Sequence, residues 1–203
     1  WAKAVTVTPD QVLPLLDVLH DDTTRYVTRS VSNHLNDIAK KDPNLMMDRL
    51  DAWKVQGKQD KRELDWMIRH ALRVLIKQGN PRALASIGYD PEVKVDVDVS
   101  ITTGAVHIGQ AMGFDVVLTA PYETPVLVDY VLWFARPGGK TARKVFKLKQ
   151  VVLAPKKPLT LQKSHRLKGD ATTFHLYPGA CRLGIQVNGR VVADLPFDLS
   201  KAQ

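Results

Sequence analysis

The sequence predicts a multidomain protein of the α + β class, in which a helical half is followed by a β-sheet half. Up to about residue 88, apolar residues recur at spacings of three and four, which is the period of an amphipathic helix. After Tyr89-Asp90-Pro91 the period changes to two, as in half-buried strands. The chain has 203 residues, enough for two domains with separate cores. We expect the helical domain at 1–88 and the sheet domain at 92–200.

Capping residues and turn signals divide the first half into helices. Proline and aspartate favour the start of a helix, and glycine favours its end. These signals predict a helix opened by Pro9-Asp10, a second over 25–40 behind Asp22-Thr23, a third from Asp42-Pro43 to Gly57, a single fourth within "DKRELDWMIRHALRVLIKQGNP" closed by Gly79 and Pro81, and a short fifth in "PRALASIG".

The helical half contains an internal repeat. Shifting "YVTRSV" by forty positions places it on "WMIRHA", so that Tyr26 meets Trp66 and Arg29 meets Arg69. A helix-pair repeat of about forty residues is the period of HEAT and armadillo solenoids. A plain helical bundle is the alternative. Because a solenoid usually needs about three repeats, we expect further repeats before Trp1.

The second half consists of short alternating segments separated by turn signals. They begin with "VKVDVDVS" and end with "RVVADLPF", and Asn188-Gly189 between the last two segments is a strong signal for a tight hairpin. Seven or eight such strands in about 110 residues predict a β-sandwich of the immunoglobulin type. The cysteine pair that joins the sheets of antibody domains is absent, and Trp133 is a candidate core residue.

The composition limits the location and the partners of the protein. A formal net charge of +8 favours a polyanionic partner, although a generally basic protein is an equal alternative. The one cysteine, Cys181, reads as a core residue, and the lack of an intrachain disulfide fits a reducing, cytoplasmic compartment. No apolar run has the roughly 20 residues that a membrane span needs, so we expect no membrane contact.

Cations and amides follow one face of the predicted second and fourth helices. In the second helix Arg25, Arg29 and Asn36 are separated by four and seven residues, and in the fourth Arg69, Arg73 and Lys77 are separated by four. The second helix of each pair lines the concave side of a solenoid. We therefore expect these side chains to face one groove that binds phosphates. An ordinary solvated helix face is the alternative.

A second basic region lies in the sheet half. Between Asp129 and Asp170 there is no acidic residue, and in "RKVFKLKQ" the alternation puts Arg143, Lys147 and Lys149 on one face. This predicts a cationic surface that contacts phosphates. The alternative is an edge strand that its lysines protect from aggregation.

Four segments together resemble a known family: "YVTRSVSNHLNDIAKKDP", "WMIRHALRVLIKQGNPRALASIGY", "VDYVLWFARPGGKTARKVFKL" and "YPGACRLGIQVNGRVVADLPF". They are similar to the bacterial alkylpurine DNA glycosylases of the AlkC branch, which join HEAT-like repeats to an immunoglobulin-like domain. The resemblance implies binding of double-stranded DNA that carries alkylated bases, hydrolysis of their N-glycosidic bonds, and action as a monomer without cofactor or metal.

The resemblance also directs attention to a carboxylate. In the family, a motif with a catalytic glutamate precedes the segment seen here, and only Trp1 could belong to it. We therefore expect the full-length parent to be a glycosylase and this chain to be inactive alone. Asp37 is the best remaining acidic candidate for catalysis, and His70 is a candidate contact to DNA. The alternative function is a non-catalytic scaffold that binds an acidic protein partner.

Overall fold

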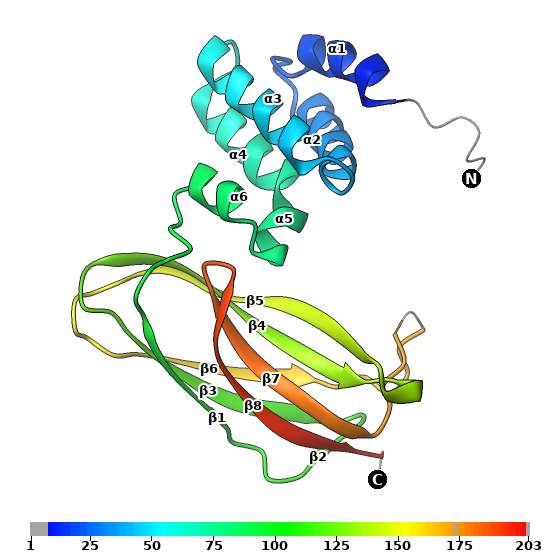
Figure 1. The fold of residues 1–203 in the computed structure, drawn as a ribbon, viewed down its shortest axis with the longest axis vertical. Helices are drawn as coiled ribbons and strands as arrows, with labels where there is room; N and C mark the ends of the chain where they lie inside the picture. Colours follow the sequence, from blue (N-terminus) through cyan, green and yellow to red (C-terminus); the bar gives the residue numbers. More distant parts are fainter. Residues whose placement is uncertain (1–7, 173, 202–203) are drawn as a thin grey trace. The chain divides into compact units, whose positions relative to one another are not determined.

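The computed structural model describes residues 8–172 and 174–201. The chain divides into two compact units, with the boundary between Ile87 and Gly88. In the described residues of the first unit all regular structure is helical, and in those of the second it is almost entirely strand (Figure 1). The predicted fold class, helical repeats followed by an immunoglobulin-like sandwich, is confirmed.

The third helix of the first unit begins and ends at the predicted capping residues. Asp42 accepts a hydrogen bond from the amide of Leu45 at 3.0 Å, and Gly57 ends the third helix in the left-handed conformation with φ of 59°. None of the described helices is long and apolar enough to cross a membrane. The helices are α1 (Pro9–Leu19), α2 (Arg25–Ala39), α3 (Pro43–Gln56), α4 (Lys61–Ala71), α5 (Arg73–Gln78) and α6 (Pro81–Ser86).

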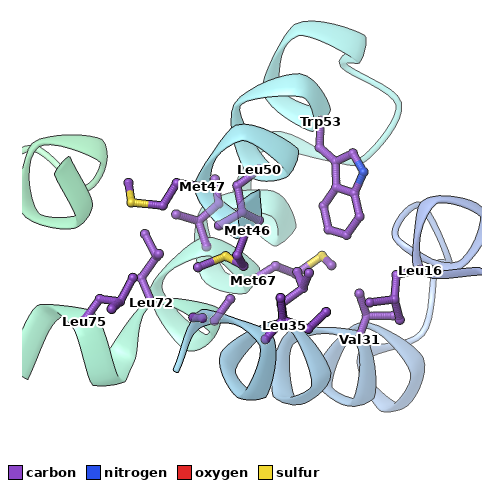
Figure 2. Packing of buried hydrophobic residues seen from close by; sticks show 14 of the residues in the cluster. Leu16, Val31, Leu35, Met46, Met47, Leu50, Trp53, Met67, Leu72 and Leu75 are labelled. Atoms are coloured by element: carbon purple, nitrogen blue, oxygen red, sulfur yellow. The ribbon is translucent and has the colours of Figure 1, made fainter. Parts of the chain in front are cut away.

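Helices α2 and α4 pack side by side, as the second helices of successive repeats do in a solenoid. The core between the helices consists of large apolar side chains. Leu35, Met46 and Met67 are fully buried, and Trp53 closes the core beside α1 (Figure 2). The apolar face predicted for the second helix therefore forms part of the core.

The prediction of one continuous fourth helix was wrong. The helix is interrupted at Leu72, where α4 ends and α5 begins. The Arg73 guanidinium donates a hydrogen bond to the backbone carbonyl of His70, in the last turn of α4.

The second unit is a sandwich of two sheets. One sheet has the order β1-β3-β6, and the other has the order β2-β8-β7-β4-β5. All named strand pairs are antiparallel except β2 with β8. The strands are β1 (Asp96–Ile101), β2 (Val106–His107), β3 (Ala111–Thr119), β4 (Thr124–Ala135), β5 (Thr141–Leu153), β6 (Leu159–Arg166), β7 (Gly179–Val187) and β8 (Arg190–Ser200), with the short helix η2 (Pro137–Gly139) before β5.

This strand order is that of an immunoglobulin-like sandwich in which β5 extends the sheet at its edge. The predicted hairpin turn joins β7 to β8. Asn188 and Gly189 have φ of 44° and 83°, as a two-residue turn of the primed type requires. Asn188 is also buried, and its side chain accepts from the amide of Leu127 at 2.8 Å. This turn therefore ties the β7–β8 hairpin to β4.

The sandwich core excludes Trp133 and includes Cys181. Side chains alternate along β4, so that Leu132 and Phe134 enter the core while Trp133 lies on the opposite face, half-buried against Gly184. The expected core role of Trp133 was therefore wrong. Cys181 is buried and unpaired, and burial raises the pKa of its thiol.

His165 on β6 makes the stability of the sandwich sensitive to acid. Its Nδ1 lies 2.8 Å from the hydroxyl of Tyr130, and burial, with a smaller effect of Lys163, lowers its pKa below 6.5. Below pH 6.5 the unfolded chain binds a proton that the folded chain resists, so the free energy of unfolding falls as the pH drops towards the folded pKa.

We expect hydrogen exchange of β3 and β6 amides to accelerate as the pH is lowered through this range, after correction for the intrinsic exchange rate. His165→Gln keeps an acceptor for Tyr130 and should flatten the pH dependence. His175→Gln, at an exposed histidine of the same unit, should leave it unchanged. Equal pH profiles for the wild type and His165→Gln would show that His165 is not the titrating group.

Candidate nucleic-acid interface

Three side chains from α2 and α4 form a stack. The Arg25 guanidinium carbon lies 3.8 Å from the centre of the Trp66 ring. On α4 itself, Trp66 and His70 are stacked, with ring centres 4.8 Å apart and an angle of 12° between the ring planes. Such a stack combines an exposed cation with aromatic faces, the two features that proteins use on nucleic-acid backbones and bases.

Glu63 holds the cation of this stack in place. Both of its carboxylate oxygens accept from Arg25, with Nε at 2.8 Å from Oε1, and Thr28 donates to the same oxygen at 2.6 Å. Desolvation tends to raise the pKa of Glu63, but the hydrogen bonds from Arg25 and Thr28 outweigh it and the pKa is lowered. This ionised carboxylate is therefore already committed to neighbouring side chains.

Asn33 joins the stack to a second arginine. Its amide oxygen accepts from Arg73 Nη2 at 3.2 Å and lies 2.9 Å from His70 Nε2. Burial, followed by the charges of Arg73, Arg29 and Arg25, lowers the pKa of His70 below 6.5. His70 is therefore neutral at pH 7, and it donates from Nε2 because the Asn33 oxygen can only accept. Its Nδ1 remains an acceptor.

Asp37 lies on the same helix as Asn33, one turn further on. Its side chain is 70% exposed and pairs with Lys40 at 2.6 Å. The hydrogen bond from Lys40 lowers the pKa of Asp37 against a smaller effect of burial, and the charges of Lys40 and Arg73 lower it further. Asp37 is thus an ionised, solvent-facing carboxylate within the field of Arg73.

The structure brings together four of the predicted DNA contacts: Arg25, Arg29, His70 and Arg73. All three arginines act on the pKa of His70, which places their charges around it. Arg29 is exposed and has no hydrogen bond or ion pair within residues 8–172 and 174–201. We call these four residues and Trp66 the arginine cluster.

Two predicted contacts lie elsewhere. Asn36 is 1% exposed, because the polar stripe of α2 packs against α4 instead of facing solvent. In the amide orientation that satisfies both groups, Asn36 donates to the Ala71 carbonyl at 3.2 Å and accepts from Arg73 at 3.3 Å. Asn36 is therefore a buried partner of Arg73. Arg69 donates to the Ile87 carbonyl at 3.3 Å, a partner that Arg73 does not share.

Lys77 is exposed in the last turn of α5, and its role in a groove stays a prediction. Sequence reasoning missed Asn33 and Glu63. The partner of Glu63, Arg25, is 38 residues away, so no local pattern indicated the pair. Trp66 had a signal, since the forty-residue repeat aligned it with Tyr26. Trp1, the possible remnant of the catalytic motif, lies outside the described residues.

The basic region of the sandwich is not a single cationic face. Lys147 lies opposite Asp129 of β4, while Lys149 lies opposite Val128, whose side chain is in the core. A β-bulge at this point adds one residue to β5 and reverses the alternation after it. Arg143 meanwhile donates to Gln186 at 2.7 Å. The prediction that Arg143, Lys147 and Lys149 share one face was therefore wrong.

No cluster of three or more histidine, cysteine or acidic side chains able to hold a metal occurs in the described part of the chain. The functional groups in and beside the arginine cluster are three guanidinium groups, a neutral imidazole, an indole ring, the amides of Asn33 and Asn36, and the Asp37 carboxylate.

Comparison with known proteins places the sandwich, and with it the chain, in a family. The family model described as "Uncharacterised protein YhaZ, C-terminal Ig-like domain" matches residues 96–201, which is the sandwich and more than half of the chain. The chain belongs to the YhaZ family. The family domain contains the whole acid-free region, whereas the arginine cluster lies before it.

Two relatives extend the match over the helical unit. The uncharacterized protein YhaZ of Bacillus subtilis (strain 168) is 30% identical over 203 residues, which cover 98% of this chain and 56% of the relative. A solved structure, the Pseudomonas fluorescens alkylpurine DNA glycosylase AlkC bound to DNA containing an abasic site analog, is 33% identical with a TM-score of 0.87. It covers 97% of this chain and 54% of that chain.

The predicted resemblance to the AlkC branch is confirmed by this structural match. This member of the YhaZ family spans about half the length of both relatives.

Proposed function

We propose that this chain binds duplex DNA as part of an alkylpurine DNA glycosylase, which hydrolyses the N-glycosidic bond of alkylated bases. One observation carries the proposal: the chain is similar over 97% of its length to AlkC, whose structure holds DNA with an abasic site analog. The arginine cluster adds a physical reason. It concentrates cations beside an aromatic ring, and its Arg29 forms no ion pair with the residues that the structure describes.

In this proposal the arginines of the cluster contact phosphates. Arg29 is exposed and unpaired among the described residues, and Arg73 keeps part of its guanidinium within reach of solvent. Guanidinium groups bind phosphate oxygens through forked donors, and they position a protein on DNA without reading its sequence. Trp66 contacts both Arg25 and His70, so its ring helps to hold these two side chains in place.

The reaction needs little from the protein besides a carboxylate and a shaped site. An N-alkylated purine is cationic and leaves readily, so the enzyme mainly stabilises the positive charge that develops on the sugar and orients a water molecule. Near the arginine cluster, Glu63 is committed to Arg25 and Thr28, whereas Asp37 is ionised and exposed. Asp37 is therefore the carboxylate that this chain has available for the role.

We expect this chain to bind methylated duplex DNA but to release methylated purines slowly. Asp37 is highly exposed and paired with Lys40, so water screens its field and it stabilises a sugar cation weakly. Base release would be followed by chromatography on duplex DNA treated with a methylating agent, next to the Pseudomonas AlkC protein.

Asp37→Asn should abolish any residual release, and Asp65→Asn, an exposed α4 carboxylate that pairs with Lys61, is the matched control. Release at the rate of AlkC that persists in Asp37→Asn would place the catalytic carboxylate elsewhere in the chain. Loss of DNA binding in the wild type would contradict the proposed function itself.

A scaffold that binds an acidic protein is the second candidate. Tyr26 in the first turn of α2 is 85% exposed, and exposed aromatic side chains are typical anchors of protein interfaces. Binding to such a partner would tolerate salt better than binding to DNA.

The proposed glycosylase function includes three further statements: the protein acts as a monomer, in the cytoplasm, and on duplexes that carry lesions.

A further inference from the structure

The open side of the sandwich carries a pocket that the proposed function does not use. Strand β5 is the last strand of the five-stranded sheet, and β6 is the last of the three-stranded sheet. A pocket of about 280 Å³ is lined by side chains from β4, β5 and β6 and from the segment between β6 and β7. It lies wholly within the second unit.

Aromatic side chains form the walls of this pocket. The rings of Phe134 and Phe174 are 5.6 Å apart at a tilt of 59°, and Phe146 lies 4.7 Å from His165. The volume is near the lower end of the range of about 300–1,000 Å³ for small-molecule sites, which suits a group of one or two rings.

Cations surround the aromatic walls. Lys144, Arg166 and Lys168 are among the residues that line the pocket, and no aspartate or glutamate is among them. The Lys144 ammonium nitrogen lies 4.2 Å from the centre of the Phe174 ring, so this charge is held directly over an aromatic face. The complementary ligand is a flat ring that carries negative charge beside it.

We infer that this pocket takes an unpaired base of a DNA strand, with Lys144, Arg166 and Lys168 on the flanking phosphates. Aromatic platforms for bases and cations for the backbone are the combination by which proteins hold single-stranded nucleic acid. The inference rests on the proposed function in one respect, that DNA is the polyanion this chain meets. It adds a second site, separate from the arginine cluster.

An acidic peptide with an aromatic residue has a similar chemistry but fits the structure less well. A peptide that docks beside an edge strand usually adds to the sheet through backbone hydrogen bonds. The edge at β5 is bulged at the pairing of Val128 and Asp129, and it carries Lys147 and Lys149. Bulges and lysines are the devices that block such strand addition.

The test compares two oligomers of equal charge on the full chain. One is an oligodeoxyadenylate octamer, and the other is an octamer of abasic tetrahydrofuran units with the same phosphates. Fluorescence anisotropy should show about tenfold tighter binding of the octamer that has bases, the effect of one stacked base. Phe174→Leu keeps an apolar wall but removes the ring, and should bring the two affinities together.

The rim is tested by Lys144→Gln with Lys168→Gln. Both side chains are exposed, so this variant should keep its thermal stability and should weaken the binding of both octamers by a similar factor. The matched control, Lys156→Gln with Lys157→Gln, removes the same charge from the β5–β6 loop, outside the pocket lining. It should weaken binding less.

Equal affinity of the wild type for the two octamers would overturn the inference, because only phosphate attraction would remain. So would tighter binding of an alternating glutamate–phenylalanine octapeptide that is lost in Phe174→Leu, since the pocket would then be a peptide site. Duplex binding is measured in parallel: if it persists, the failure concerns this pocket alone and leaves the proposed function intact. Base-dependent binding of the octamer without duplex binding would support the pocket and contradict the proposed function.

Discussion

Replacing Arg29 and Arg73 together by glutamine is expected to weaken duplex DNA binding by about a hundredfold or more at low salt. Both guanidinium groups surround His70 in the arginine cluster, and each charge-assisted bond to a phosphate contributes about 1.5–3 kcal/mol. Each contact also releases condensed counterions. The slope of log affinity against log salt should therefore become shallower by about 1.8 for two contacts.

The matched control for this pair is Arg62→Gln with Arg69→Gln. It removes the same charge from the neighbouring helix α4, but Arg69 turns to the carbonyl of Ile87 and Arg62 lies outside the cluster. Anisotropy titrations at several salt concentrations should show a nearly unchanged slope for the control. Equal losses in both variants would mean that the net charge of the unit, and not the arginine cluster, attracts DNA.

Trp53→Ala is expected to destabilise the helical unit by about 3–5 kcal/mol, a large part of the 5–15 kcal/mol that stabilises a typical domain. Trp53 is fully buried in the helical core (Figure 2), and its ring stacks on His20 with ring centres 4.4 Å apart. Its indole nitrogen donates to Asp17 at 2.8 Å, and Asp17 in turn accepts from Arg49. The substitution removes the ring and leaves part of this network without a donor.

Thermal unfolding followed by the helical circular dichroism signal would measure this effect. Trp53→Phe is the control, since it keeps a stacked ring but removes the bond to Asp17, and it should cost about 1–2 kcal/mol. Hydrogen exchange in the sandwich should be unchanged, because Trp53 belongs only to the helical core cluster. A Trp53→Ala protein with a wild-type melting temperature would show that the ring contributes little to the core.

The sequence by itself determined the features that depend on near neighbours in the chain. The change of period after Tyr89 separated helices from strands, because both periods are written in the spacing of apolar residues. The cap at Asp42, the helix end at Gly57 and the turn at Asn188-Gly189 were equally readable. Each depends on the backbone preferences of one or two residues.

Only the tertiary structure decided which polar side chains share a surface. The forty-residue repeat aligned Tyr26 with Trp66, but it could not reveal that Glu63 would bind Arg25 from 38 residues away. The spacing in α2 placed Asn36 on a polar face, and the packing of α4 against that face buried it. Partners from another element leave no trace in local spacing.

In both basic regions, an irregularity in the helix or strand interrupts the spacing from which a shared face was predicted. Helix α4 ends before α5 begins at Arg73, and Arg69 and Arg73 bond to different carbonyls, those of Ile87 and His70. The bulge in β5 put Lys149 on the opposite side from Lys147, since a strand alternates at every residue. Periodicity places a side chain only while its helix or strand is unbroken, and here contacts with the rest of the fold decided where each one was broken.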